Sequence, residues 1–234
     1  LFSHVAVAYS QLKEAEEELI GVNQLDTGSV RISATETALH GILMDELVHF
    51  RNHFPAIRLF ITNESTPEAF QTLKKGLADF AVVTSPLDVP VGFQKTSLKY
   101  FREILVASTD STFSKKMVIS PTDLVSYPVI GLGHHSKTHE FYSHLLLAYG
   151  VEWQPDIDVA TADQILPMIK SGLGIGFLPE FMANHDLEQG TIVKIKVSNL
   201  QLKREIVLLE DKTKILNAAA KELKKQIVSN NVQN

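Results

Sequence analysis

The sequence contains no cysteine and no long hydrophobic run. The absence of cysteine excludes disulfide bonds, thiolate metal ligands and a cysteine nucleophile, and it fits a reducing compartment. No apolar run approaches the ~20 residues of a membrane-spanning helix. The first residues also lack the basic start and apolar core of a signal peptide. We therefore expect a cytoplasmic protein.

An excess of positive charge is absent as well. Lys and Arg number 22 against 27 Asp and Glu, which gives a formal charge of −5. Binding to nucleic acid needs a concentrated basic face, so we expect any DNA contact to lie outside these residues. Hydrophobic residues at 44% and charged residues at 21% are ordinary for a globular protein. A length of 234 residues favours two modest lobes over one.

The first residues have the pattern of a helix that pairs with another helix. Phe2, Val5, Tyr9, Leu12 and Leu19 recur at helical spacing, and acidic side chains surround this narrow apolar stripe. A helix packed on its own domain is the alternative. We favour a projecting linker and dimerisation helix over residues 1–21, and hence a homodimer or homotetramer.

The rest of the chain alternates strand and helix patterns, which predicts an α/β fold with a parallel sheet covered on both faces. The expected strands are Val30–Ile32, Leu59–Asn63, Phe80–Thr84, Ile104–Ser108, Pro128–Gly131, Ile157–Ala160, Ile175–Leu178, Thr191–Val197 and Arg204–Glu210. The expected helices are Leu39–Phe54, Glu68–Leu77, Pro121–Ser126, Thr138–Tyr149, one before Gly172, and Leu216–Ile227. Ser229–Asn234 is expected to be a frayed tail.

Lys170–Pro179 is expected to be a scaffold element. Gly172 suits the left-handed position that closes a helix, Ile175–Leu178 fits a buried strand, and Pro179 suits the first turn of a following helix. A dinucleotide fingerprint needs its glycines after a strand and before a helix, whereas these glycines follow a helix. No cofactor is therefore expected.

The helix before this run has two candidate starts. Thr161 and Gln164 are spaced as a capping box, but a start there would place Pro167 in the helix interior. We therefore expect Asp163 to be the cap, with Pro167 in the first turn.

Three loops are candidates for a ligand site, because ligands bind beyond the carboxyl ends of parallel strands. Thr35 and Thr37 follow the first strand, where two hydroxyls could hold a carboxylate, sulfate or phosphate oxygen or merely cap the helix. The loop 63–67 follows the second strand and fits an ordinary helix start equally well. The loop 131–136 carries glycines that would allow close backbone approach to a ligand.

Four histidines lie close together in the sequence: His134, His135, His139 and His144. A metal site is one interpretation, since two of them are one helical turn apart. No H-E-x-x-H arrangement accompanies them, and clustered surface histidines are common, so no metal is expected. No nucleophile elbow, phosphate loop or pair of placed carboxylates is present, which argues against an enzyme.

The chain resembles the linker helix and effector-binding region of a LysR-type transcriptional regulator. The resemblance covers almost the whole chain and is carried by the order and spacing of several segments: 16–19, 27–33, Phe54–Pro55, 59–62, Leu73–Val82 with its Gly76 and Asp79, and Ile169–Pro179.

This family implies two Rossmann-like subdomains of the type II periplasmic-binding kind, joined by two crossover segments, with a small-molecule effector in their cleft. It also implies an upstream winged helix-turn-helix that binds operator DNA, a part missing from these residues, and RNA polymerase as a possible partner. The expected boundaries are 28–98 and 195–229 for subdomain I and 99–194 for subdomain II.

The resemblance also implies a ligand site but no catalytic residue. The implied contacts are Thr35, Glu36, Thr37, Ser65, Thr66, Gly133, His134 and Thr161. Glu36 departs from the pattern, since a carboxylate in the cleft would repel an anion; either it points to solvent or the effector carries a cation. The alternatives to a regulator are a solute-binding protein of a transport system and an enzyme that uses Glu36, Glu64 or His134.

Overall fold

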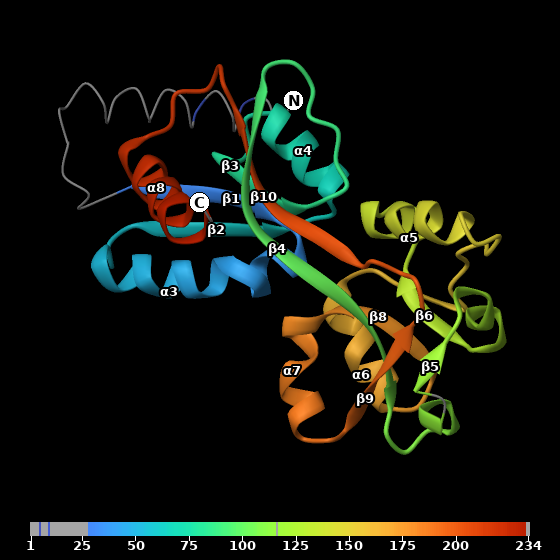
Figure 1. The fold of residues 1–234 in the computed structure, drawn as a ribbon. Coiled ribbons are helices and arrows are strands. Elements are labelled where there is room, and N and C mark those ends of the chain that lie inside the picture. Colours follow the sequence, from blue (N-terminus) through green and yellow to red (C-terminus); the bar gives the residue numbers. More distant parts are fainter. Residues whose placement is uncertain (1–4, 6–8, 10–27, 116, 233–234) are drawn as a thin grey trace. The chain divides into compact units, whose positions relative to one another are not determined.

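The computed structural model describes residues 5, 9, 28–115 and 117–232 (Figure 1). The linker helix expected over residues 1–21 lies outside this part of the chain, apart from Val5 and Tyr9. The described residues form an α/β fold, as predicted, in two compact units: 28–83, 88–99 and 207–232 make the first, and 84–87 and 100–206 the second. No helix among them is both long and apolar enough to cross a membrane.

The first unit is built around three parallel strands. β1 (Ser29–Ala34) lies between β2 (Arg58–Asn63) and β3 (Phe80–Thr84), and the strand order continues through β10 to β4. The last residue of β1, Ala34, pairs with Asn63 and with Val82. The remaining elements are α2 (Glu36–Ala38), a π-helical turn (Leu39–Leu43), α3 (Met44–His53), α4 (Thr66–Lys74), the first part of β4 (Phe93–Ser108), the last part of β10 (Lys203–Asp211) and α8 (Ala218–Asn231).

The buried face of α3 differs from the predicted one. In the sequence, Leu47 and Val48 continue the helical spacing of Leu39, Ile42 and Leu43, which predicts that both face the core, yet Val48 is 59% exposed. Phe50 is fully buried instead, and Glu46 is only 7% exposed. The π-helical turn Leu39–Leu43 explains the shift, because its extra residue rotates everything that follows away from the regular 3.6-residue spacing.

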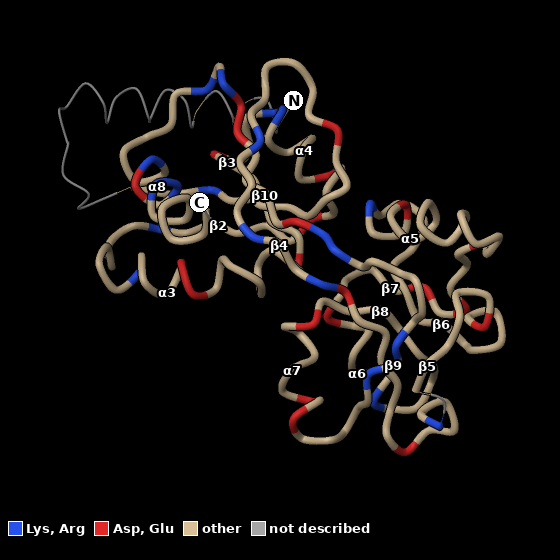
Figure 2. Tube along the Cα trace, in the orientation of Figure 1, with Lys and Arg blue, Asp and Glu red and all other residues tan. Residues whose placement is uncertain are grey.

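The predicted frayed tail is wrong up to residue 231. α8 continues through this segment, and its amides donate to the buried carboxylate of Glu46: Gln226 at 2.6 Å, Asn230 at 3.0 Å and Asn231 at 2.8 Å. The polar side chains that suggested a tail therefore serve a buried acceptor on another helix. Basic residues are also visible on α8 (Figure 2), where Lys224 donates to Glu210 of β10 at 2.6 Å.

The second unit has a mixed sheet in the order β5-β9-β4-β8-β6-β7. β4 runs antiparallel to β8 and β9, whereas β6 is parallel to β7 and β8, and β5 to β9. The fully parallel sheet predicted here is therefore wrong. β4 enters this sheet directly from the first unit, without a crossover helix before it. Two strands must run parallel only when a crossover connection joins them, so β4 is free to run antiparallel to its neighbours. The elements are β5 (Val118–Ile119), β6 (Val129–Leu132), α5 (Lys137–Leu147), β7 (Ile157–Val159), α6 (Ile165–Lys170), β8 (Ile175–Pro179), α7 (Glu180–Glu188), β9 (Ile192–Val197) and single 3-10 segments at Thr112–Lys115, Pro121–Ser126 and Ala162–Gln164.

Helices cover both faces of this sheet. Along β4, Ile104 and Val106 pack into one buried cluster, while Leu105 and Ala107 pack into another. Each cluster is closed by helical residues, Tyr142 of α5 in one and Ile169 of α6 in the other. A strand buried on both faces must be apolar at consecutive positions, which is why this run does not alternate.

Two local predictions around the glycine run need correction. Gly172 has φ of 76° and closes α6, as predicted. Asp163, however, is not the cap: Thr161 caps a short 3-10 segment that comes first, and α6 begins only at Ile165, with Gln164 in its N-cap position. Pro167 thus remains in the first turn. Pro179 ends β8 and caps α7, one residue before its expected place.

Candidate functional site

The loops that follow β1 and β2 lie side by side at one edge of the first unit. Because Ala34 and Asn63 are paired, the residues after them leave the sheet together. Two backbone bonds hold this arrangement: Thr35 N–H donates to Val82 O at 3.1 Å, and Glu64 N–H donates to Ala34 O at 2.9 Å. The structure therefore brings together the first two predicted loops, as expected for parallel neighbours.

The two threonines of the first loop have different roles. Thr35 caps the helix, since its hydroxyl oxygen accepts from Ala38 N–H at 3.3 Å, so the capping alternative is confirmed for this residue. Thr37 is only 7% exposed. Within the described part of the chain its hydroxyl has no hydrogen-bond partner. Thr37 thus offers an unused donor and acceptor at the edge.

Glu36 does not point freely to solvent. Its side chain is 13% exposed, its Oε1 lies 2.8 Å from Nε2 of His40, and its Oε2 accepts from the amide of Asn63. The carboxylate is therefore held by its own helix and by the end of β2. These contacts hold the carboxylate in place but leave its negative charge, because Asn63 is neutral and His40 is charged only if protonated.

Glu64 is engaged in a similar way. Its Oε2 accepts from Ser33 Oγ at 2.5 Å, and its Oε1 accepts from Thr72 Oγ1 at 2.9 Å. Two hydroxyls therefore hold this second carboxylate. This edge therefore carries two hydrogen-bonded carboxylates and the unpartnered hydroxyl of Thr37. Such a polar surface can both donate and accept hydrogen bonds.

Ser65 begins α4 as part of a capping box. Its N–H and hydroxyl donate to Glu68 Oε2 at 2.9 and 2.7 Å, and these two bonds lower the pKa of Glu68. The ordinary helix start is thus confirmed for Ser65, whose hydroxyl proton is already used. Thr66 is buried at the first position of α4.

The remaining predicted residues meet at one edge of the second unit. Leu132 and Val159 end the paired parallel strands β6 and β7, so Gly133, His134 and Thr161 follow at the same side. Thr161 N–H donates to Gln164 Oε1 at 3.3 Å. A Cβ on Gly133 would lie 3.8 Å from the nearest side-chain atom, on Asp158. This position therefore has room for a side chain.

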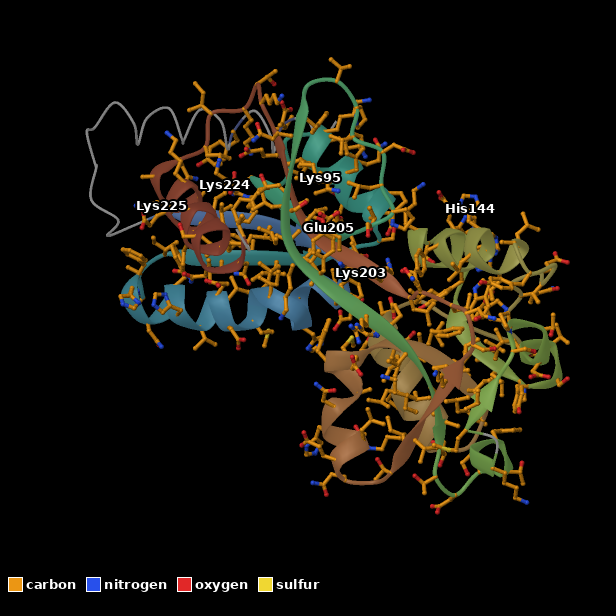
Figure 3. All side chains as sticks on the ribbon, viewed as in Figure 1. Lys95, His144, Lys203, Glu205, Lys224 and Lys225 are labelled. Carbon is orange, nitrogen blue, oxygen red and sulfur yellow. The ribbon has the colours of Figure 1, made fainter. Side chains whose placement is uncertain are left out.

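The histidines of this edge are close but do not form a metal centre in the described chain. The rings of His134 and His135 lie 4.2 Å apart, and Nδ1 of His139 lies 3.3 Å from Leu132 O. Across the described residues, no group of three or more His, Cys, Asp or Glu is arranged to hold a metal ion. His144 is labelled on α5 in Figure 3.

One buried polar cluster was missed by the sequence analysis. Arg204, 2% exposed, donates to Glu103 Oε1 at 2.7 Å, to Thr84 Oγ1 at 2.9 Å and to Ser85 O at 2.8 Å. Burial, followed by the charge of Glu103, raises the pKa of Tyr142 well above its usual range. The available signal was the strand-end rule, since Thr84 ends β3 and Ser85 follows it directly.

Known proteins are similar to this chain in sequence and in fold. A model of the LysR substrate binding domain matches residues 23–231. The chain belongs to this family. A probable RuBisCO transcriptional regulator of Thalassiosira pseudonana is 25% identical over 226 residues, covering 89% of this chain and 73% of the relative. The uncharacterized HTH-type transcriptional regulator YeiE of Escherichia coli K12 is 20% identical over 219 residues, covering 92% and 74%.

Solved structures of the LysR family have the same fold. The regulatory domain of Synechocystis PCC6803 CcmR in complex with 2-PG aligns with a TM-score of 0.77 at 16% identity, covering 88% of this chain and 98% of that one. The effector binding domain of QuiR in complex with shikimate gives 0.75 at 15%, covering 88% and 97%. The chain is thus the effector-binding domain of a LysR-type regulator, and the transport alternative is not supported.

Proposed function

We propose that this LysR domain binds a small polar metabolite through the loops after β1 and β2 in the first unit and after β6 and β7 in the second. Thr35, Glu36, Thr37, Ser65, Thr66, Gly133, His134 and Thr161 are the contacts. The observation that carries the proposal is the Thr37 hydroxyl beside the end of β1, which has no hydrogen-bond partner in the described chain although the residue is only 7% exposed. An accessible hydroxyl of this kind can both donate to and accept from a ligand.

The ligand class follows from the edge of the first unit. Glu36 and Glu64 accept hydrogen bonds, and the Thr37 hydroxyl can both donate and accept them, so a hydroxyl-rich or otherwise polar metabolite is favoured. The relatives of similar fold that were solved with shikimate and with 2-PG bind ligands of this polar kind. We propose that the domain senses such a ligand without transforming it.

Ligand binding would alter DNA binding through a winged helix-turn-helix of the regulator. This domain would act in a homodimer or homotetramer. The ligand must bind one arrangement of the regulator better than another, and a coupling of about 1–3 kcal/mol corresponds to a difference of roughly 5- to 150-fold. Light scattering of the purified protein with and without ligand measures the oligomer.

The test is thermal unfolding against shikimate, 2-PG, sulfate, phosphate, amino acids and sugars. A true ligand at 100 times its Kd adds about 2.7 kcal/mol of stability. Thr37→Val keeps the shape of the side chain and removes only the hydroxyl, so it should abolish the ligand shift while leaving the free protein equally stable. Thr35→Ser, which keeps the cap, is the matched control.

Loss of the shift in both variants would indicate damage to the loop. An unchanged shift in Thr37→Val would remove this hydroxyl from the site. Analysis of the ligand after prolonged incubation tests the sensing role, because any protein-dependent conversion would point to an enzyme.

A further inference from the structure

Two histidines on consecutive turns of α3 form a pair that is separate from the predicted ligand contacts. His49 and His53 are four residues apart, so their side chains lie on the same face of the helix. Both are exposed, and their ring centroids lie 4.3 Å apart. Two imidazoles bound to one ion at about 2.0 Å and at right angles to each other have centroids about 4.5 Å apart. The observed spacing therefore matches that of a chelating pair.

Hydrogen bonds fix which nitrogen of each ring is free. Nδ1 of His53 lies 2.9 Å from the backbone oxygen of His49, and Nδ1 of His49 lies 3.0 Å from Oε1 of Gln226 on α8. Carbonyl and amide oxygens only accept, so each Nδ1 carries a proton and donates. In the neutral rings, Nε2 is therefore the nitrogen with a lone pair available to a ligand.

The orientation of the Gln226 amide follows from its other contacts. Its Nε2 donates to the backbone oxygen of Glu46 at 2.9 Å and to Oε2 of the same residue at 2.6 Å. The amide nitrogen thus faces Glu46, and Oε1 is left for His49, on the side where α8 lies beside α3 (Figure 1). Histidines that bind metals have the same arrangement: the second ring nitrogen donates to an oxygen, which orients the ring and makes the other nitrogen a better ligand.

The surroundings of the pair favour a cation. Within the part of the chain that the structure describes, neither Nε2 atom has a hydrogen-bond partner. The pair lies in the last turns of α3, where the helix dipole is negative. Asp45, exposed and one turn before His49, adds a carboxylate to the same face. Arg51, the basic residue between the two histidines, donates to the backbone oxygen of Ile57 at 2.8 Å.

We propose that His49 and His53 bind a divalent late first-row metal ion, Cu²⁺ or Ni²⁺, through their two Nε2 atoms, with water completing the coordination. Two imidazoles at right angles suit the square-planar or tetragonal geometry of these ions better than the tetrahedral geometry of Zn²⁺. The ion links the last two turns of α3. The site lies outside the effector loops and does not depend on the proposed function.

Ni²⁺ is the probe for affinity and Cu²⁺ the probe for the ligands, each added to protein without an affinity tag. Titration calorimetry gives the Kd for Ni²⁺, and electron paramagnetic resonance of bound Cu²⁺ reports its nitrogen ligands. We expect saturable Ni²⁺ binding, no response to Mg²⁺, which prefers oxygen ligands, and a Cu²⁺ spectrum of two imidazole nitrogens. Because protons compete with the metal for the ring nitrogens, the affinity should fall as the pH is lowered.

Substitutions on the face of α3 test the pair. His53→Ala should weaken Ni²⁺ binding by at least about tenfold, since even the loss of an outer-shell partner costs about 10- to 100-fold. The double variant Val48→His/His53→Ala is the matched control, because it keeps the number of histidines but puts two at adjacent positions, which do not face each other on a helix. Val48 is 59% exposed, so this change should not disturb the fold. The double variant should bind Ni²⁺ as weakly as His53→Ala, whereas His144→Ala on α5 should bind it like the unsubstituted protein.

Unchanged Ni²⁺ affinity in His53→Ala would overturn the proposal. Full affinity in the double variant would also overturn it, because the number of histidines and not their spacing would then decide. A loss in His144→Ala as large as in His53→Ala would place the ion in the second unit, with the same consequence. Circular dichroism of each variant checks that its helices are retained.

Discussion

The buried ion pair of the second unit gives the sharpest prediction for stability. Arg204 and Glu103 have side chains 1% and 2% exposed, and Nη1 lies 2.7 Å from Oε1. Arg204→Met removes the cation and leaves the carboxylate in the interior, together with the carbonyl of Ser85 and the hydroxyl of Thr84 that Arg204 also bonds. Breaking a buried pair on one side costs about 3–5 kcal/mol.

Urea unfolding followed by circular dichroism measures this cost. With a slope of about 3 kcal/mol per M, the midpoint should fall by about 1–2 M for Arg204→Met. The double variant Glu103→Leu/Arg204→Met replaces the pair by apolar groups of similar volume and should recover most of the loss, because two desolvated charges are removed together.

Two results would refute the reasoning. A loss below about 1 kcal/mol in Arg204→Met would mean that the pair is as weak as a surface ion pair. A double variant as unstable as the single one would mean that packing of Arg204, whose guanidinium also lies 5.6 Å from the Phe101 ring, carries the effect.

Two further predictions concern glycine contacts and acid stability. Gly131→Ala should destabilise the protein by about 1–3 kcal/mol in urea unfolding, because its Cβ would lie 2.9 Å from a proline ring. Gly133→Ala, which has room for a Cβ, should leave the stability unchanged. Equal losses of stability in the two variants would contradict this reasoning. Hydrogen bonds from Lys170 and from a threonine lower the pKa of Asp186. The stability that this carboxylate contributes is present above its unfolded pKa and is lost as pH falls through the folded pKa. Unsubstituted protein and Asp186→Asn should thus differ at neutral pH and converge in acid, and a difference independent of pH would exclude Asp186 as the cause.

Hydrophobic spacing and turn residues in the sequence were enough to predict most elements of the fold, but not β5 or the first part of β4. β3 occupies Phe80–Thr84 as expected, and the glycine at 172 has the left-handed backbone of a helix end. Such features depend on neighbours a few residues away, so they can be deduced before any tertiary contact is known. The alternation of strands and helices then limits the fold to a covered α/β sheet.

The candidate site was predicted as a set of loops, but the roles of its residues were not. The strand-end rule placed Thr35 and Thr37 at one edge, which the pairing of β1 and β2 confirms. That Thr35 caps and Thr37 stays unpaired depends on the local path of the helix. That Glu36 is held by Asn63 depends on a residue 27 positions away.

The sequence by itself determined which segments are strands and helices, where several of them end and which family the chain resembles, because these depend on local spacing and order. Only the tertiary structure decided the direction of β4 against β8 and β9, the burial of Glu46 under α8 and the pairing of Arg204 with Glu103. Each of these depends on residues far apart in the chain. A polar side chain has the same local pattern whether its partner is water or a distant amide, so its role is fixed only when the folded chain supplies that partner.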